Sequence, residues 1–115
     1  MYQSAYSEVV AVSGSAGRRR EREALDRALS LLGEARATGL RSARGAEAVF
    51  FTNRVWSYLI EDLSLSENEL PEGVRADLIS IGFFIIRRLE AVRVGDTSAL
   101  DDVVEVMSLI RDGLE

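Results

Sequence analysis

This chain contains few of the residue types whose side chains take part in catalysis. It contains no His, Cys or Lys, so all 14 basic residues are Arg. The commonest general base, the thiol nucleophile and the Schiff-base amine are therefore missing. Arg stays protonated at working pH. Carboxylates, tyrosines and hydroxyls remain, and this set favours a protein that binds a partner over an enzyme.

Two acidic groups are the candidates for catalysis or cation binding. Glu61 and Asp62 are adjacent in a predicted helix and point about 100° apart, whereas a glycosidase pair must converge. Asp101, Asp102 and Glu105 offer oxygen ligands, but their spacing does not match a calcium loop. Acids near a helix N-terminus are favourable without any ligand. We therefore expect solvated charges and ion pairs, with no metal and no cofactor.

One basic cluster, residues 18–22, holds four Arg around Glu21 and is the candidate for phosphate contacts. Residues 18–44 hold eight Arg against four acids (+4), and the remainder holds six Arg against fifteen acids (−9), so the net charge is −5. Arg at a helix start opposes the helix dipole, which points to a purpose for the cluster. However, acids are interleaved and aromatics are not, which disfavours nucleic acid as the direct ligand.

Apolar residues recur at helical spacing along the chain, which predicts an all-α, antiparallel up-down four-helix bundle. The predicted helices cover residues 18–37, 42–63 and 71–94, and a last helix capped by Thr97 or Ser98. Gly39 and Gly95 are predicted to end two of them. The helix at 71–94 is apolar on more than one side, which predicts a central place in the bundle. In the helix at 42–63, the residues predicted to face inward are Val49, Phe50, Trp56, Leu59, Ile60 and Leu63.

The chain divides into a predicted arm with a hinge, residues 1–17, and a helical bundle, residues 18–115. Tyr2 and Tyr6 share one face of the arm if it forms a short helix, and residues 13–17 are small, as in a hinge. The longest apolar stretch, residues 78–86, is far shorter than the roughly 20 residues of a membrane span. With no visible signal peptide, we expect a cytoplasmic protein without a membrane partner.

Three features near the middle of the chain leave alternatives open. Trp56 is expected in the core, with an indole N–H that needs a partner. Arg54 and Asp77 are expected to pair across the bundle, although Arg and aromatic clusters also mark interface anchors. Gly82 inside a helix indicates close approach of another helix, which comes either from the fold or from a partner.

Several blocks of this chain together resemble the FlaF family of flagellar biosynthesis regulators, over nearly the whole length. The blocks are Met1-Tyr2-Gln3, Ala5-Tyr6, Ala24-Leu25-Asp26-Arg27-Ala28, Asn53-Arg54-Val55-Trp56, Leu59-Ile60-Glu61-Asp62-Leu63, Leu70-Pro71, Arg75-Ala76-Asp77-Leu78-Ile79-Ser80-Ile81-Gly82 and Ile110-Arg111-Asp112-Gly113-Leu114. The Trp56 to Leu63 and Arg75 to Gly82 blocks are the most specific.

The resemblance implies a function that composition and spacing do not show. FlaF-like proteins occur in flagellated alphaproteobacteria and support flagellin synthesis and export, opposite FlbT, which represses flagellin translation. The leading hypothesis is therefore a cytoplasmic flagellin-binding chaperone and regulator, similar in fold to the FliS chaperones. The alternative is an RNA-binding or translation-regulating module that acts with a FlbT-like partner on flagellin mRNA. The resemblance carries no catalytic residues.

The predicted partner surface combines these observations. We expect the arm to place its tyrosines against an apolar groove of the bundle, and flagellin to compete for the same groove. The predicted partner-binding residues are Tyr2, Tyr6, Arg54, Trp56, Asp62, Arg75, Asp77 and Phe83.

Overall fold

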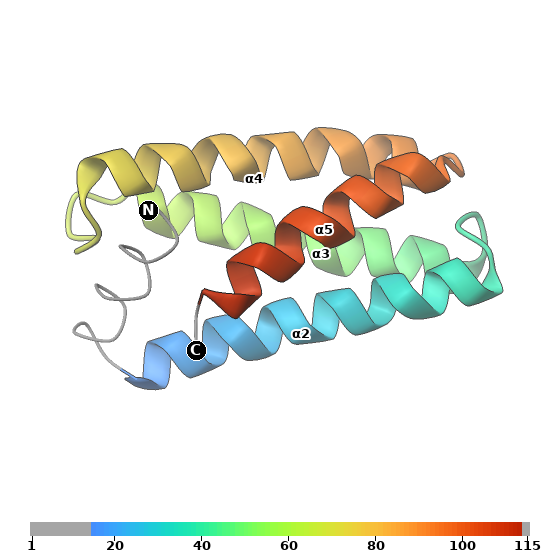
Figure 1. The fold of residues 1–115 in the computed structure, drawn as a ribbon, viewed down its shortest axis with the longest axis horizontal. Coiled ribbons are helices and arrows are strands. Elements are labelled where there is room, and N and C mark those ends of the chain that lie inside the picture. Colours follow the sequence, from blue (N-terminus) through green and yellow to red (C-terminus); the bar gives the residue numbers. More distant parts are fainter. Residues whose placement is uncertain (1–14, 114–115) are drawn as a thin grey trace.

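A computed structural model describes residues 15–113, which form four helices and no strand. The helices are α2 (Ser15–Thr38), α3 (Ala43–Ser64), α4 (Glu72–Arg93) and α5 (Thr97–Asp112). Successive helices run in opposite directions and are joined by short loops (Figure 1). The predicted all-α up-down bundle is confirmed. α2 begins at Ser15, inside the segment predicted as a hinge, and the placement of the arm lies outside the described residues.

The four helices form a ring in which each packs on two neighbours. α2 contacts α3, α3 contacts α4, α4 contacts α5, and α5 closes the ring on α2. In Figure 1, α5 crosses obliquely in front, and α3 lies behind it. The central place predicted for α4 is wrong, since α4 occupies one position in the ring like the other helices. Its second apolar side is therefore turned toward the surface.

Local signals explain most of the helix ends. The Ser42 hydroxyl accepts the Gly45 N–H and caps α3. Gly39 and Gly95, with φ of 106° and 105°, follow α2 and α4 in the left-handed conformation that glycine adopts without strain. The N-cap of α5 is Asp96, whose carboxylate accepts N–H groups of Ser98 and Ala99. The predicted cap at Thr97 or Ser98 is wrong by one or two residues.

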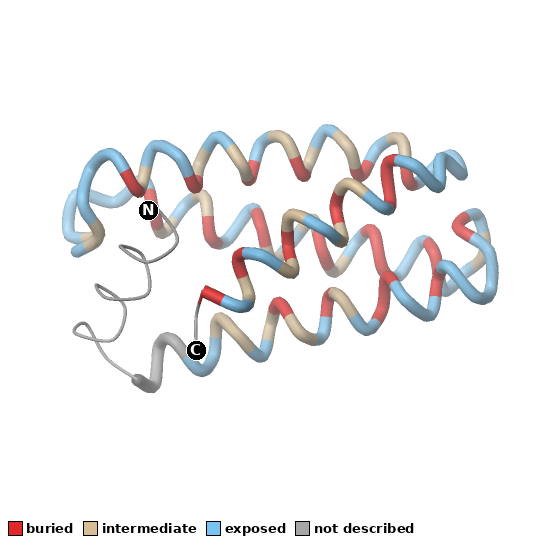
Figure 2. Tube along the Cα trace, viewed as in Figure 1, coloured by how far each residue is buried: buried red, intermediate tan, exposed pale blue. Residues whose placement is uncertain are grey.

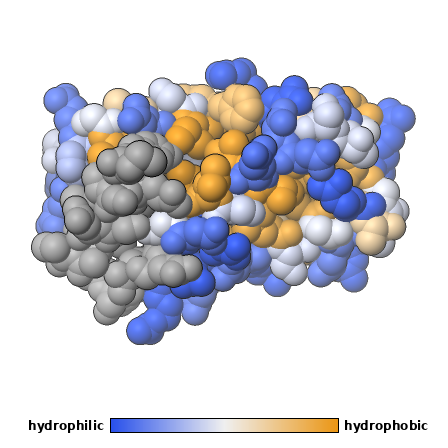
Figure 3. Space-filling view, in the orientation of Figure 1, coloured by the Kyte–Doolittle hydropathy of each residue, from blue (hydrophilic) through white to orange (hydrophobic). Residues whose placement is uncertain are grey.

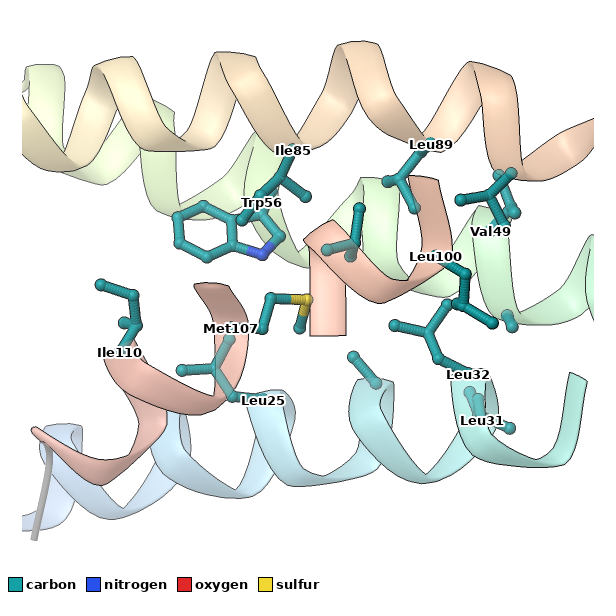
Figure 4. Packing of buried hydrophobic residues seen from close by; sticks show 14 of the residues in the cluster. Leu25, Leu31, Leu32, Val49, Trp56, Ile85, Leu89, Leu100, Met107 and Ile110 are labelled. Carbon is teal, nitrogen blue, oxygen red and sulfur yellow. The ribbon is translucent and has the colours of Figure 1, made fainter. Parts of the chain in front are cut away.

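Buried apolar side chains line the inner side of all four helices (Figure 2). The centre is the Trp56 indole, with Ile85 of α4 on one side and Met107 of α5 on the other (Figure 4). Trp56 is 1% exposed, so its predicted place in the core is confirmed. Phe50 is 64% exposed, so its predicted inward orientation is wrong. Each residue advances 100° around a helix, and six residues place Phe50 about 120° away from Trp56.

Ion pairs fasten α5 to both of its neighbours. Arg88 of α4 pairs with Asp102 at 3.0 Å, and Arg36 of α2 pairs with Asp101 at 2.7 Å. At the other end of α5, Arg111 pairs with Asp26 of α2 at 2.7 Å. All these side chains are part-exposed, so each pair adds little stability and mainly fixes how α5 lies against α2 and α4.

Two glycines with opposite surroundings give a matched test of the packing. Gly33 is exposed inside α2, with nothing within 4 Å of an added Cβ, whereas a Cβ on Gly45 would overlap the Leu40 carbonyl. We expect Gly33→Ala to raise the free energy of unfolding by about 1 kcal/mol, because Ala is the better helix former. Gly45→Ala should lower it by about 1–3 kcal/mol through overpacking.

Urea unfolding followed by circular dichroism measures both variants against the parent chain. A Gly45→Ala protein as stable as the parent would show that the close approach of Leu40 to α3 is not part of the native fold.

The Asp96 cap makes stability depend on pH. The Ala99 N–H, followed by the Ser98 hydroxyl, stabilises the carboxylate and holds the pKa of Asp96 below its ordinary value. A carboxyl whose folded-state pKa is lowered stabilises the fold above its unfolded pKa, and this contribution is lost as pH falls through the folded pKa. We expect Asp96→Asn, which keeps an acceptor oxygen, to lose less thermal stability than the parent on acidification.

Melting temperatures measured between about pH 6 and about pH 2 test this linkage. Asp77→Asn, at an exposed acid that caps no helix, is the control. Parallel curves for Asp96→Asn and the parent would contradict it.

Candidate partner-binding surface

The structure places the predicted partner-binding residues in three different settings. Trp56 is buried in the core and unavailable to a partner, whereas Arg54 and Phe83 are exposed. Tyr2 and Tyr6 lie outside the described residues. Among the predicted residues that the structure describes, the buried Trp56 therefore does not share a surface with Arg54 and Phe83.

Asp62 and Arg75 hold the loop between α3 and α4. The Asn68 amide donates to the Asp62 carboxylate at 3.2 Å and to its carbonyl at 3.3 Å. The Arg75 guanidinium donates to the carbonyls of Leu63 and Leu65, at 3.3 and 2.9 Å. Leu63 lies in the last turn of α3, where carbonyls lack helical partners, and Leu65 is the C-cap residue that follows the helix. Both residues thus have an evident structural task.

The predicted pair between Arg54 and Asp77 is wrong: within the described chain, no ion pair joins them. Arg54 lies over the Phe50 ring of its own helix, with the guanidinium carbon 5.8 Å from the ring centre. Asp77 is exposed on α4. The Arg54 guanidinium is therefore stacked but has no acidic partner among the described residues.

The acidic and basic clusters noted in the sequence lie on different helices, α5 and α2. Asp101 and Asp102 pair with Arg36 and Arg88, as the expectation of ion pairs required. In the described part of the chain, no group of three acidic residues is arranged to hold a metal ion. The basic cluster lies one turn inside α2, since that helix begins at Ser15, and Arg19 and Arg20 are exposed there.

The surroundings of Gly82 show which helix approaches it closely. A Cβ on Gly82 would lie 2.8 Å from Cγ1 of Ile60 and 3.1 Å from the Trp56 ring, so the close approach comes from α3 within the fold. This contact sets α3 and α4 against each other in a defined register. Residues spaced by seven along each helix then share one side, and the two sides meet.

The outer part of this contact is apolar and exposed. On α4, Ile79 and Ile86 are part-buried against the core, and Phe83 between them is 49% exposed. On α3, Phe50 is the exposed aromatic residue. We define the α3–α4 surface as Ala46, Phe50, Asn53, Arg54 and Ile60 of α3 with Ile79, Phe83, Ile86 and Arg93 of α4.

One end of the α3–α4 surface is hollowed. The hollow measures about 270 Å³ and is lined by Ala46, Val49, Phe50, Asn53, Arg54 and Arg93. Its floor is apolar, and its rim carries an amide and two guanidinium groups. Small-molecule sites usually measure about 300–1,000 Å³, so this hollow suits a single side chain better than a whole ligand.

Hydrophobic side chains also show on the face where α5 lies (Figure 3). Phe84 of α4 and Val106 of α5 are only part-buried, and α5 carries the exposed Leu109. This face lacks an exposed aromatic residue among those described, whereas the α3–α4 surface has two. Large exposed apolar side chains gathered on one surface are typical of protein–protein contacts, which makes the α3–α4 surface the stronger candidate.

Sequence reasoning missed Phe50 and Asn53 as members of this surface. The signal for Asn53 is the seven-residue spacing of Ala46, Asn53 and Ile60, which matches that of Ile79, Ile86 and Arg93. Phe50 lies between Ala46 and Asn53, four residues after the first and three before the second, so it borders the same row. Each helix thus has a second stripe beside its core stripe. From the sequence alone, such a stripe cannot be told apart from a core stripe, because the positions of the neighbouring helices are not known.

The structure is thus a small four-helix bundle with an exposed apolar surface between α3 and α4. The sequence model of the flagellar protein FlaF family matches residues 2–114. The chain therefore belongs to the FlaF family of flagellar proteins. No curated protein and no solved structure matches it. Among the described helices, none combines the length and apolar character needed to cross a membrane.

The Gly82 contact yields a stability prediction. We expect Gly82→Ala to lower the melting temperature although Ala is the better helix former, because the new methyl group meets Ile60 and Trp56. Ile60→Ala removes the nearest atoms, so in that background Gly82→Ala should be less destabilising. A double-mutant cycle by urea unfolding should give a coupling of about 1 kcal/mol. Additive effects would mean that the helices do not meet at this point.

Proposed function

We propose that this protein is a cytoplasmic flagellin-binding chaperone and regulator that supports flagellin synthesis and export without catalysing a reaction. Membership of the FlaF family supports its place in flagellum biogenesis. The observation that carries the binding role is the pair of exposed aromatic residues, Phe50 and Phe83, on the α3–α4 surface. The partner is flagellin, and a FlbT-like regulator is a second expected partner.

The physical case rests on what flagellin presents before assembly. Its terminal segments form amphipathic helices, whose apolar faces are uncovered until they pack in the filament. Two adjacent antiparallel helices with an apolar stripe between them bind such a face by adding a further helix to the bundle. Aromatic anchors at the stripe supply most of the binding energy in contacts of this kind. No catalytic group is needed for that role.

The proposal predicts that both exposed phenylalanines contribute to flagellin binding. In calorimetric titration of purified flagellin into the full chain, Phe50→Ser with Phe83→Ser should weaken binding by at least about 2 kcal/mol. Leu109→Ser is the matched control, because Leu109 is 55% exposed, close to the 49% of Phe83, and lies on α5 outside the α3–α4 surface. Circular dichroism should show that all variants keep the helical fold.

Two outcomes would count against this function. Absence of binding by the parent chain would remove the chaperone role, and an equal loss of affinity in the Leu109→Ser control would show that the α3–α4 surface is not the binding site. Binding of flagellin mRNA that weakens steeply with salt and depends on Arg19 and Arg20 would favour the translation-regulating alternative.

A further inference from the structure

We propose that the hollow at the end of the α3–α4 surface receives an apolar side chain of an amphipathic helix, with a carboxylate of that helix, one turn away, at its rim. The inference rests on the proposed function in one respect, since flagellin is the expected source of the helix. It goes further by stating which chemistry the bound segment carries.

The argument begins with the polar groups at the rim. Arg54 has no acidic partner among the described residues, and its guanidinium lies over the Phe50 ring. Among the residues that the structure describes, Arg93 pairs only with Glu90 of its own helix, at 3.1 Å, and both side chains are largely exposed. Such a surface pair is weak and exchanges readily. Two guanidinium groups thus flank the hollow and are available to an incoming carboxylate.

Asn53 adds a third donor to the rim. Its carbonyl oxygen accepts the Ser57 hydroxyl at 3.3 Å, so its amide NH₂ is the group left for a ligand. The rim therefore offers donors from three side chains, above a floor of Ala46, Val49 and Phe50. An occupant that fits both the donors and the floor carries an apolar group together with a negatively charged hydrogen-bond acceptor. This local positive rim stands out on a chain whose net charge is −5.

The shape of the surface selects a helix as the occupant. From the hollow, the apolar stripe continues along α4 through Ile86 to Ile79, a run of about 20 Å at helical rise. A straight stripe of this length fits the i, i+3, i+4, i+7 anchors of an amphipathic helix. An apolar residue and a Glu or Asp placed three or four residues apart lie on the same face of such a helix, so they reach floor and rim together.

Two synthetic amphipathic helical peptides of about 18 residues test the inference. They are identical except that the Glu one turn from the central Leu is Gln in the second. Amide chemical shifts of the labelled full chain report the site, and the titration gives Kd. We expect shifts at residues 46–54 and Arg93, and about tenfold weaker binding of the Gln peptide.

Protein variants complete the design. Arg54→Gln and the near-isosteric Asn53→Asp should reduce the preference for the Glu peptide, whereas Arg87→Gln, exposed on α4 outside this surface, should not. Absence of shifts, shifts elsewhere, or equal affinity for both peptides would overturn the inference.

The same variants with flagellin separate the two proposals. If flagellin binds the parent and the Arg54 and Asn53 variants equally, the inference fails and the function stands. If the Glu peptide binds as expected and flagellin does not bind at all, the proposed function fails alone.

Discussion

The close contact at Gly82 determines how the rest of the molecule is arranged. Because Gly82 has no side chain, Ile60 and Trp56 of α3 reach the backbone of α4, and the two helices are fixed against each other at one point. Because α3 and α4 are antiparallel, this contact also determines which other residues of the two helices lie side by side. Phe50 and Arg54 of α3 therefore lie next to the end of α4 that carries Arg93. The core beneath and the hollow above therefore depend on the same register.

The ring arrangement explains why an apolar surface is left over. Each helix packs on two neighbours, so one inward stripe is enough to bury its core residues. α4 has more apolar residues than that stripe accommodates, and Ile79, Phe83 and Ile86 stay at the edge. Ion pairs hold α5 against α2 and α4, so α5 does not cover them. Only a further element can bury this edge.

The helices and most core positions follow from the sequence, because apolar spacing of 3.6 residues is a strong local signal. This periodicity does not identify Asp96 as the N-cap of α5. Asp, Thr and Ser are all good N-caps, and only the observed hydrogen bonds distinguish among them. The Arg54 and Asp77 pair fails for a geometric reason: the Gly82 register places Asp77 roughly three helical turns from Arg54. Register between helices is a property of packing that single-helix periodicity does not contain.

The absence of Lys has a structural consequence that bears on binding. A guanidinium is planar and donates in several directions, so it stacks on a ring and still offers hydrogen bonds at its edge. Arg27 lies over Phe51 and Arg54 over Phe50 in this way, on opposite flanks of α3. Arg75 meanwhile closes the carbonyl end of α3. Stacking holds the Arg54 group in place before a partner arrives, which lowers the entropy lost on binding. An ammonium group on a flexible chain would leave the same rim charged but unordered.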